Sequence, residues 1–248
     1  MTTTGDRIAD AWLDAMTVLC ELTPHGWHAE RGDARALVSG VGVGSLNIAV
    51  STAREPGPDS LRSLDEAARD VAKHGLPWSI VVLGEAGADL AGLADRHGLT
   101  GGGPITVMVC DADRADLRAK PALIDRVGPH RSQDYTEVLA AGFETPAGIF
   151  GDLMGGGVLD DPRIAGYLTE SATGLGIRTG GLIGVYNIAV RPEARSQGLG
   201  RAMTARVMAD GFAAGATSAY LQTSTVGRPL YESMGFRTVQ TWATFFTT

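Results

Sequence analysis

The stretch that decides the fold is Asn187-Ile-Ala-Val-Arg-Pro-Glu-Ala-Arg-Ser-Gln-Gly-Leu-Gly-Arg-Ala-Met203. It opens with the end of an apolar strand that is predicted over about 182–190, then turns, and places two glycines where a helix starts at about 198. Glycines at such a place let backbone N–H groups converge on an anion, because no Cβ blocks the approach. The positive end of the helix dipole adds attraction for phosphate. Positive side chains follow nearby at Arg191, Arg195, Arg201 and Arg206. The stretch therefore predicts a site for a ligand that contains a diphosphate.

The spacing of the glycines narrows the choice of ligand. The dinucleotide fingerprint Gly-x-Gly-x-x-Gly fails, since Met203 stands at its third position, and the Gly-Lys-Ser/Thr ending of a triphosphate loop is absent. The pattern Arg195-x-x-Gly198-x-Gly200 instead resembles the Gln/Arg-x-x-Gly-x-Gly/Ala signature of the GCN5-related N-acetyltransferases, the GNAT family. In that family the signature binds the pyrophosphate of CoA.

The resemblance covers about 182–236 and implies acetyl-CoA as co-substrate and an amine as acetyl acceptor. It implies that Ile188, Ala189 and Val190 pair with the pantetheine arm through a strand that splays from its neighbour. The cofactor-binding residues that it implies next are Arg195, Ser196, Gln197, Gly198, Leu199, Gly200, Arg201 and Ser224. The segment 230–236, Leu-Tyr-Glu-Ser-Met-Gly-Phe, is similar to the family's Leu-Tyr-Glu-x-x-Gly-Phe. There the tyrosine is proposed to protonate the departing thiolate, so Tyr231 is the candidate catalytic residue.

The sequence departs from the family at two polar positions. Ser224 stands where many members have an asparagine that contacts the cofactor. Gln222 stands where a glutamate often serves as the general base, and an amide cannot take a proton. Either another carboxylate, such as Glu144 or Glu170, acts through water, or the amine arrives already neutral.

The two halves of the chain repeat each other. Asn47-Ile-Ala-Val recurs as Asn187-Ile-Ala-Val, and each copy precedes a turn, a helix, a strand, a short helix and a final strand. Chance similarity of two mixed α/β domains is the alternative to duplication. The fold predicted is α/β with two tandem GNAT-like domains, 1–118 and 119–248, each a central mixed sheet with a splayed strand pair flanked by helices. The polar run 111–120 would connect them.

The N-terminal copy is predicted to be degenerate and to lack a cofactor loop. Under the repeat, Arg195, Gly198 and Gly200 correspond to Glu55, Pro58 and Ser60, and Tyr231 corresponds to Ala94. Proline removes an N–H group, and Glu55 adds a negative charge where a phosphate would lie.

Composition bounds the remaining function classes. The chain has 248 residues, 44% of them hydrophobic and 20% charged, with a formal net charge of −7. An acidic surface repels nucleic acid, and neither a membrane span nor a signal pattern is visible, so a cytoplasmic protein is expected. No metal site is expected from the scattered histidines, His25 and His28 included. Cys20 and Cys110 could pair, but reduced, buried thiols are expected in that compartment.

Two readings of function remain open. The first is an N-acetyltransferase that acts by direct transfer on the amine of a small molecule or a protein. The second is a catalytically silent CoA-binding module that senses cofactor or regulates a partner. The sequence leaves the acceptor open, and it allows a monomer or a homodimer.

Overall fold

The computed structural model describes residues 3–53, 57–120 and 122–247. Its contacts group the chain into two compact units. Unit 1 comprises Met1–Ala15 and Val107–Val239, and unit 2 comprises Met16–Thr106 and Gln240–Thr248. Each unit therefore takes one terminal segment from the opposite end of the chain. The domain boundary at 118/119 stays a prediction.

Unit 2 is built on a helix packed against a short sheet. Its elements are β1 (Trp27–Arg31), β2 (Ala34–Val38), β3 (Asn47–Ser51), α2 (Pro58–Ala72), β4 (Ser79–Val82) and α3 (Ala88–Arg96). Leu64, Ala68 and Val71, spaced along one face of α2, are buried with Ile80 and Val82 of β4. β3 and β4 run parallel and stay paired to the last residue of each, Ser51 opposite Val82. The splayed strand pair predicted for this half is therefore wrong, because β4 uses all of its residues in the ladder.

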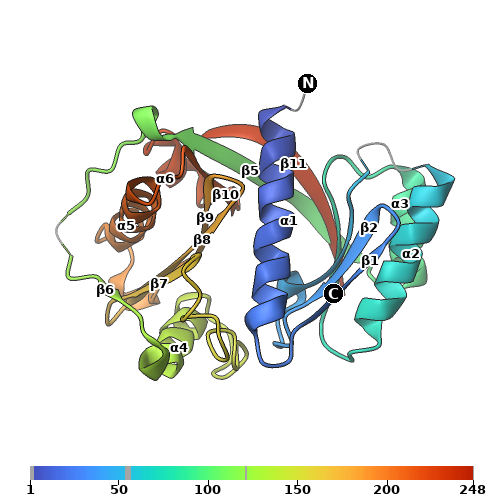
Figure 1. The fold of residues 1–248 in the computed structure, drawn as a ribbon, viewed down its shortest axis with the longest axis horizontal. Helices are drawn as coiled ribbons and strands as arrows, with labels where there is room; N and C mark the ends of the chain where they lie inside the picture. Colours follow the sequence, from blue (N-terminus) through green and yellow to red (C-terminus); the bar gives the residue numbers. More distant parts are fainter. Residues whose placement is uncertain (1–2, 54–56, 121, 248) are drawn as a thin grey trace. The chain divides into compact units, whose positions relative to one another are not determined.

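Unit 1 holds the predicted cofactor loop. Its elements are β6 (Asp125–Arg126), α4 (Ser132–Gly142), β7 (Ile164–Leu168), β8 (Ala172–Thr179), β9 (Leu182–Val190), α5 (Leu199–Ala213), β10 (Ser218–Thr223) and α6 (Arg228–Glu232). In Figure 1, α4 and α5 lie on opposite faces of the sheet formed by β7, β8 and β9. Helix α5 approaches β9 closely, because a Cβ at Gly211 would lie 2.7 Å from Cγ1 of Ile183. The last third of α5 therefore packs directly against β9.

The eleven strands in the described part of the chain follow one hydrogen-bonded order, β1-β2-β3-β4-β11-β5-β10-β9-β8-β7-β6. Figure 1 labels these strands. The fold is thus a mixed α/β fold with a single mixed sheet flanked by helices. The prediction of a separate central sheet in each half is wrong. The reason is the length of β5 (Gly101–Asp111) and β11 (Arg237–Phe246), each of which has residues in both units. The tandem duplication itself stays a prediction.

The first helix is α1 (Thr4–Leu22). Ile8, Trp12 and Leu19 are among its buried side chains. Within unit 1, Oγ1 of Thr179 donates a hydrogen bond to the Ala11 carbonyl at 2.6 Å. No helix among the described residues is both long enough and apolar enough to cross a membrane.

Candidate functional site

Strands β9 and β10 diverge after a short paired stretch. They pair in parallel from Ser218 opposite Leu182 to Tyr220 opposite Gly184. β9 then continues to Val190 and β10 to Thr223, and the described residues form no further pairs between these two strands. Backbone groups on the β10 side of β9 are therefore available to a ligand, as at any open sheet edge. Ile188, Ala189 and Val190, predicted to pair with pantetheine, lie on this segment.

A β-bulge bends β9 within the diverging segment. Thr173 of β8 pairs with Ala189 and Leu175 pairs with Tyr186, so one residue of β8 lies opposite two of β9. Asn187 takes a φ of +51°, a left-handed conformation that asparagine tolerates better than most residues. Oγ1 of Thr173 donates to the Asn187 carbonyl at 2.8 Å. Since a bulge increases local twist, it contributes to turning β9 away from β10.

The loop after β9 presents a run of unpaired backbone donors. After the 3₁₀ turn Pro192–Ala194, Ser196 has a φ of +62° and Gly198 a φ of +91°, and α5 starts at Leu199. The described residues offer no acceptor to the N–H groups of residues 196–201. The last of these belong to the first turn of a helix 15 residues long, whose dipole favours an anion. The loop has the geometry of a phosphate site.

The side chains of Arg195 and Arg201 form bonds with other segments of the protein. Nη2 of Arg195 donates to the Gly142 carbonyl at 3.0 Å and lies 2.6 Å from Oε1 of Glu144. Nε of Arg201 donates to the Arg118 carbonyl at 2.6 Å, and its Nη2 pairs with Oδ2 of Asp116 at 2.9 Å. Both guanidinium groups hold the protein together around the loop. Their predicted role as phosphate ligands stays a prediction, and it would need these bonds to exchange.

The other residues of the predicted set lie in the loop, at the start of α5 and before α6. Gln197 is exposed, with Nε2 donating to the Glu193 carbonyl at 3.3 Å, and Leu199 packs against the core of unit 1. A Cβ at Gly200 would lie 3.6 Å from Leu230, an ordinary contact. Ser224 is exposed, and its Oγ accepts a hydrogen bond from the Gly227 N–H at 3.3 Å. It therefore supports the turn that leads into α6.

Tyr231 lies on α6, half-buried against the core of unit 1. Its ring meets Phe236 edge-on, with centroids 5.8 Å apart. None of the described residues makes a hydrogen bond to its hydroxyl, and burial raises the pKa of this phenol to about 12. The group is therefore protonated, and able to donate, throughout the physiological range of pH.

The residues considered for the role of general base differ in their surroundings. Glu144 is ion-paired with Arg195, and Glu170 is exposed in the turn between β7 and β8. Gln222 lies on β10 two residues beyond Tyr220, where pairing with β9 ends. Its buried Nε2 has no hydrogen-bond partner among the described residues. The amide of Gln222, where β9 and β10 diverge, can donate a hydrogen bond to a ligand, but it cannot act as a base.

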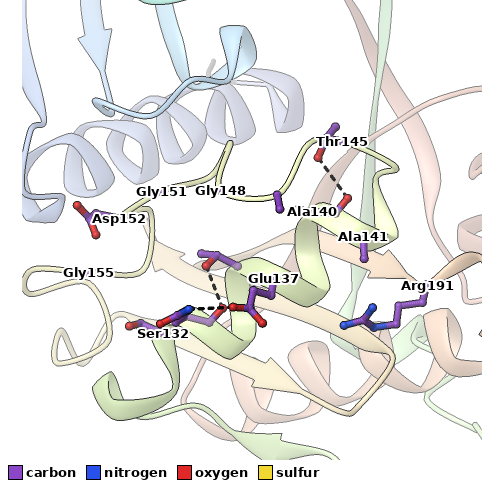
Figure 2. Close-up of a pocket in the computed structure, with 13 residues that line it drawn as sticks. Ser132, Glu137, Ala140, Ala141, Thr145, Gly148, Gly151, Asp152, Gly155 and Arg191 are labelled. Atoms are coloured by element: carbon purple, nitrogen blue, oxygen red, sulfur yellow. Dashed lines mark hydrogen bonds between the residues drawn. The ribbon is translucent and has the colours of Figure 1, made fainter.

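A cavity of about 890 Å³ adjoins the end of β9. Figure 2 shows it between one face of α4 and the glycine-rich loop that includes Gly148, Gly151 and Gly155, with Arg191 at one side. Carboxylates from Glu137 and Asp152 line it. Nε2 of Gln133 donates to Oε1 of Glu137 at 2.9 Å, which holds that side chain against α4. The two carboxylates can pair with a cationic group of a ligand, whereas Arg191 would repel one.

In unit 2 an internal carboxylate lies at the start of α2. Oγ of Ser60 donates to Oδ2 of Asp33, and the N–H and Oγ1 of Thr52 both donate to the Asp33 carbonyl at 2.8 Å. Pro58, the first residue of α2, lacks an N–H group. Glu55 lies outside the described residues, and Ala94 is buried in α3. The absence of a cofactor site in this half stays a prediction, and Asp33 is a stronger physical reason for it than Glu55 was.

Two further observations complete the site. Cys20 and Cys110 are both free and buried, and among the described residues no three His, Cys, Asp or Glu side chains are grouped to hold a metal ion.

Lys120, which the motif did not include, lies over the loop: a Cβ at Gly198 would be 3.4 Å from Cδ of this lysine. The sequence offered no signal for that contact, because Lys120 and Gly198 are 78 positions apart in the chain.

The segment that carries this candidate site resembles a known domain family. Residues 158–238, all within unit 1, match the family model described as the acetyltransferase (GNAT) domain. Over this segment the chain is similar to the GNAT domain. No curated protein matches the sequence.

Solved structures resemble the whole chain. A GCN5-related N-acetyltransferase from Kribbella flavida superposes with a TM-score of 0.69 at 19% identity, over 99% of this chain and 96% of the other. A GCN5-related N-acetyltransferase from Sphaerobacter thermophilus gives 0.58 at 19% identity, over 86% and 76%. A GCN5-related N-acetyltransferase-like protein from Streptococcus suis gives 0.55 at 14% identity, over 98% of both chains. At these identities the likeness shows the fold alone.

Proposed function

We propose that unit 1 binds acetyl-CoA and transfers its acetyl group directly to the amine of a small molecule or a protein. The observation that carries this proposal is the run of unpaired N–H groups over residues 196–201, at the start of α5 and beside the open edge of β9. An anion-binding loop next to an open strand suits a ligand with a diphosphate at one end and an amide-containing arm at the other. The family model over 158–238 supports the same ligand.

The chemistry follows from the groups at the splay. The amine nitrogen attacks the thioester carbonyl, a C–N bond forms, and the C–S bond breaks with release of the CoA thiolate. Tyr231 gives its proton to that thiolate and regains one from solvent or from the amine. Backbone N–H groups of β9 are suited to stabilise the negative charge that develops on the carbonyl oxygen. We place the acceptor in the cavity beside α4, because Arg191, which lines it, directly follows Val190.

A silent CoA-binding module is the second candidate. The observation that favours it is Gln222, an amide without a partner where the family often has a carboxylate base. A module of this kind would bind the cofactor and release no product.

The first test combines binding with turnover. Acetyl-CoA at a hundredfold excess over its dissociation constant should raise the free energy of unfolding by about 2.7 kcal/mol, since it binds only the folded state. A panel of amines is then screened for release of free CoA thiol. Stabilisation with amine-dependent release supports the enzyme, and stabilisation without release for any amine supports the module. No stabilisation contradicts both.

A carboxylate at position 222 should change how activity depends on pH. The wild type offers no base at Gln222, so its kcat/KM should rise with pH until the acceptor amine is neutral. In Gln222→Glu the carboxylate can accept the amine's proton above its own pKa, which lies below that of an amine. We expect the rise to move to lower pH and kcat/KM at pH 7 to increase about tenfold. Gln222→Leu, which removes the amide without adding a base, should show no such shift. Identical pH profiles for the Glu and Leu variants would exclude a base at this position.

A further inference from the structure

A lysine outside the motif lies against the phosphate loop. A Cβ placed on Gly198 would lie 3.4 Å from Cδ of Lys120, 3.8 Å from Cγ and 4.0 Å from Cε. The stem of the lysine thus crosses the loop at the residue whose φ of +91° opens the helix. Among the described residues, none forms a hydrogen bond or ion pair with its ammonium group.

This ammonium is the positive side chain at the loop that remains uncommitted. The guanidinium groups of Arg195 and Arg201 are bonded to carbonyl and carboxylate oxygens of the protein. The formal net charge of the chain is −7, so a diphosphate needs a local cation to offset the surrounding field. An ammonium on a flexible stem can aim its three donors at phosphate oxygens once a ligand arrives.

The segment that carries Lys120 is held in place by the motif itself. The N–H of Asp116 donates to the Met234 carbonyl at 3.0 Å. Nε of Arg201 donates to the Arg118 carbonyl at 2.6 Å, and its Nη2 pairs with Asp116. Arg201, in the first turn of α5, thereby ties this segment beside the loop, two residues before Lys120.

We propose that Lys120 binds the pyrophosphate of the CoA ligand together with the N–H groups of residues 196–201, and that Arg201 is a positioning residue that presents it. This inference rests on the proposed function and assigns a ligand-binding residue that lies outside the matched domain segment. It also assigns Arg201 a different task from the one that the motif implied.

Binding measurements on three forms of the full chain test the proposal. Lys120→Met keeps the apolar stem and removes the charge, and Lys73→Met is the matched control, because Lys73 in unit 2 is the other lysine of the chain. We expect Lys120→Met to weaken binding of CoA, measured by titration calorimetry, about tenfold or more, as loss of a charge-assisted contact does. Dephospho-CoA keeps the pyrophosphate, so its affinity should fall by the same factor. Lys73→Met should bind both ligands as the wild type does.

Each other outcome has a distinct meaning. If the wild type binds CoA and Lys120→Met binds it equally well, the role of Lys120 is overturned while the proposed function stands. A loss confined to CoA would move the contact to the 3′-phosphate and overturn the pyrophosphate assignment. If the wild type does not bind CoA, both proposals fall.

A second measurement needs no variant. Reductive methylation followed by mass spectrometry reports on both lysines in one sample. CoA should protect Lys120 from methylation and leave Lys73 as reactive as before. Equal reactivity of Lys120 with and without bound CoA would contradict the proposal.

Discussion

Glutamate at position 198 is expected to abolish acetyl-CoA binding, lowering the affinity by at least about a hundredfold. Gly198 has a φ of +91° at the start of α5, where a side chain would be strained and would lie against Lys120. A carboxylate there would accept hydrogen bonds from the loop N–H groups and pair with the lysine. It would thus take the place of the phosphate it is meant to exclude.

The same helix provides a matched control at its other end. Gly215 follows α5 with a φ of +95°, and no heavy atom lies within 4 Å of its Cβ position. Gly215→Glu therefore adds the same charge and a similar left-handed strain of about 1–2 kcal/mol, far from the loop. Calorimetric titration of both variants, with the free energy of unfolding measured in parallel, separates binding from stability. Equal affinity in Gly198→Glu and the wild type would place the cofactor elsewhere.

Removing the hydroxyl of Tyr231 should have the largest effect on turnover. We expect Tyr231→Phe to lower kcat about a hundredfold, the lower end of what a general acid contributes, while the dissociation constant of acetyl-CoA stays unchanged. The phenyl ring keeps the edge-on contact with Phe236, and the lost hydroxyl has no partner among the described residues. Stability should therefore change little.

The pKa of Tyr231 adds a test in pH. Burial raises it to about 12, so the phenol keeps its proton at every pH below that value. The kcat of the wild type should then show no alkaline loss attributable to this group below about pH 11. Tyr167→Phe is the control, since it removes a hydroxyl that is bonded to Asp210 at 2.8 Å in the same unit. It should cost stability and leave kcat intact. Unchanged kcat in Tyr231→Phe would remove the tyrosine from the mechanism.

The elements that the sequence predicted well are those with a strong apolar period. The strand 182–190 was predicted with the bounds it has, and the helix predicted to start at about 198 begins at Leu199. β1 was not predicted, because none of its side chains is fully buried and Trp27–Arg31 contains no β-branched residue. Apolar periodicity cannot reveal a strand that buries so little.

The site was predictable in its backbone and not in its side chains. Glycine spacing located the loop, since the left-handed conformation at Gly198 is a local property. The partners of Arg195 were not predictable, because the Gly142 carbonyl it bonds is 53 residues away in the chain. The carboxylate of Asp33 at the start of α2 and the lysine over Gly198 are likewise brought in by tertiary structure. A sequence motif identifies the charged residues, but tertiary packing determines which groups their side chains contact.

The pairing of β4 with β11 sets an order for folding during synthesis. Ser79–Val82 leaves the ribosome long before residues 243–246, its partners, and the whole of 107–239 is made in between. Until then one edge of β4 has no strand to pair with and is open to wrong association. Most of unit 2 is translated first, but its sheet is completed only when β11 has been made. A fragment cut at 118 would lack that strand, so expression of the N-terminal half alone should yield an aggregating chain.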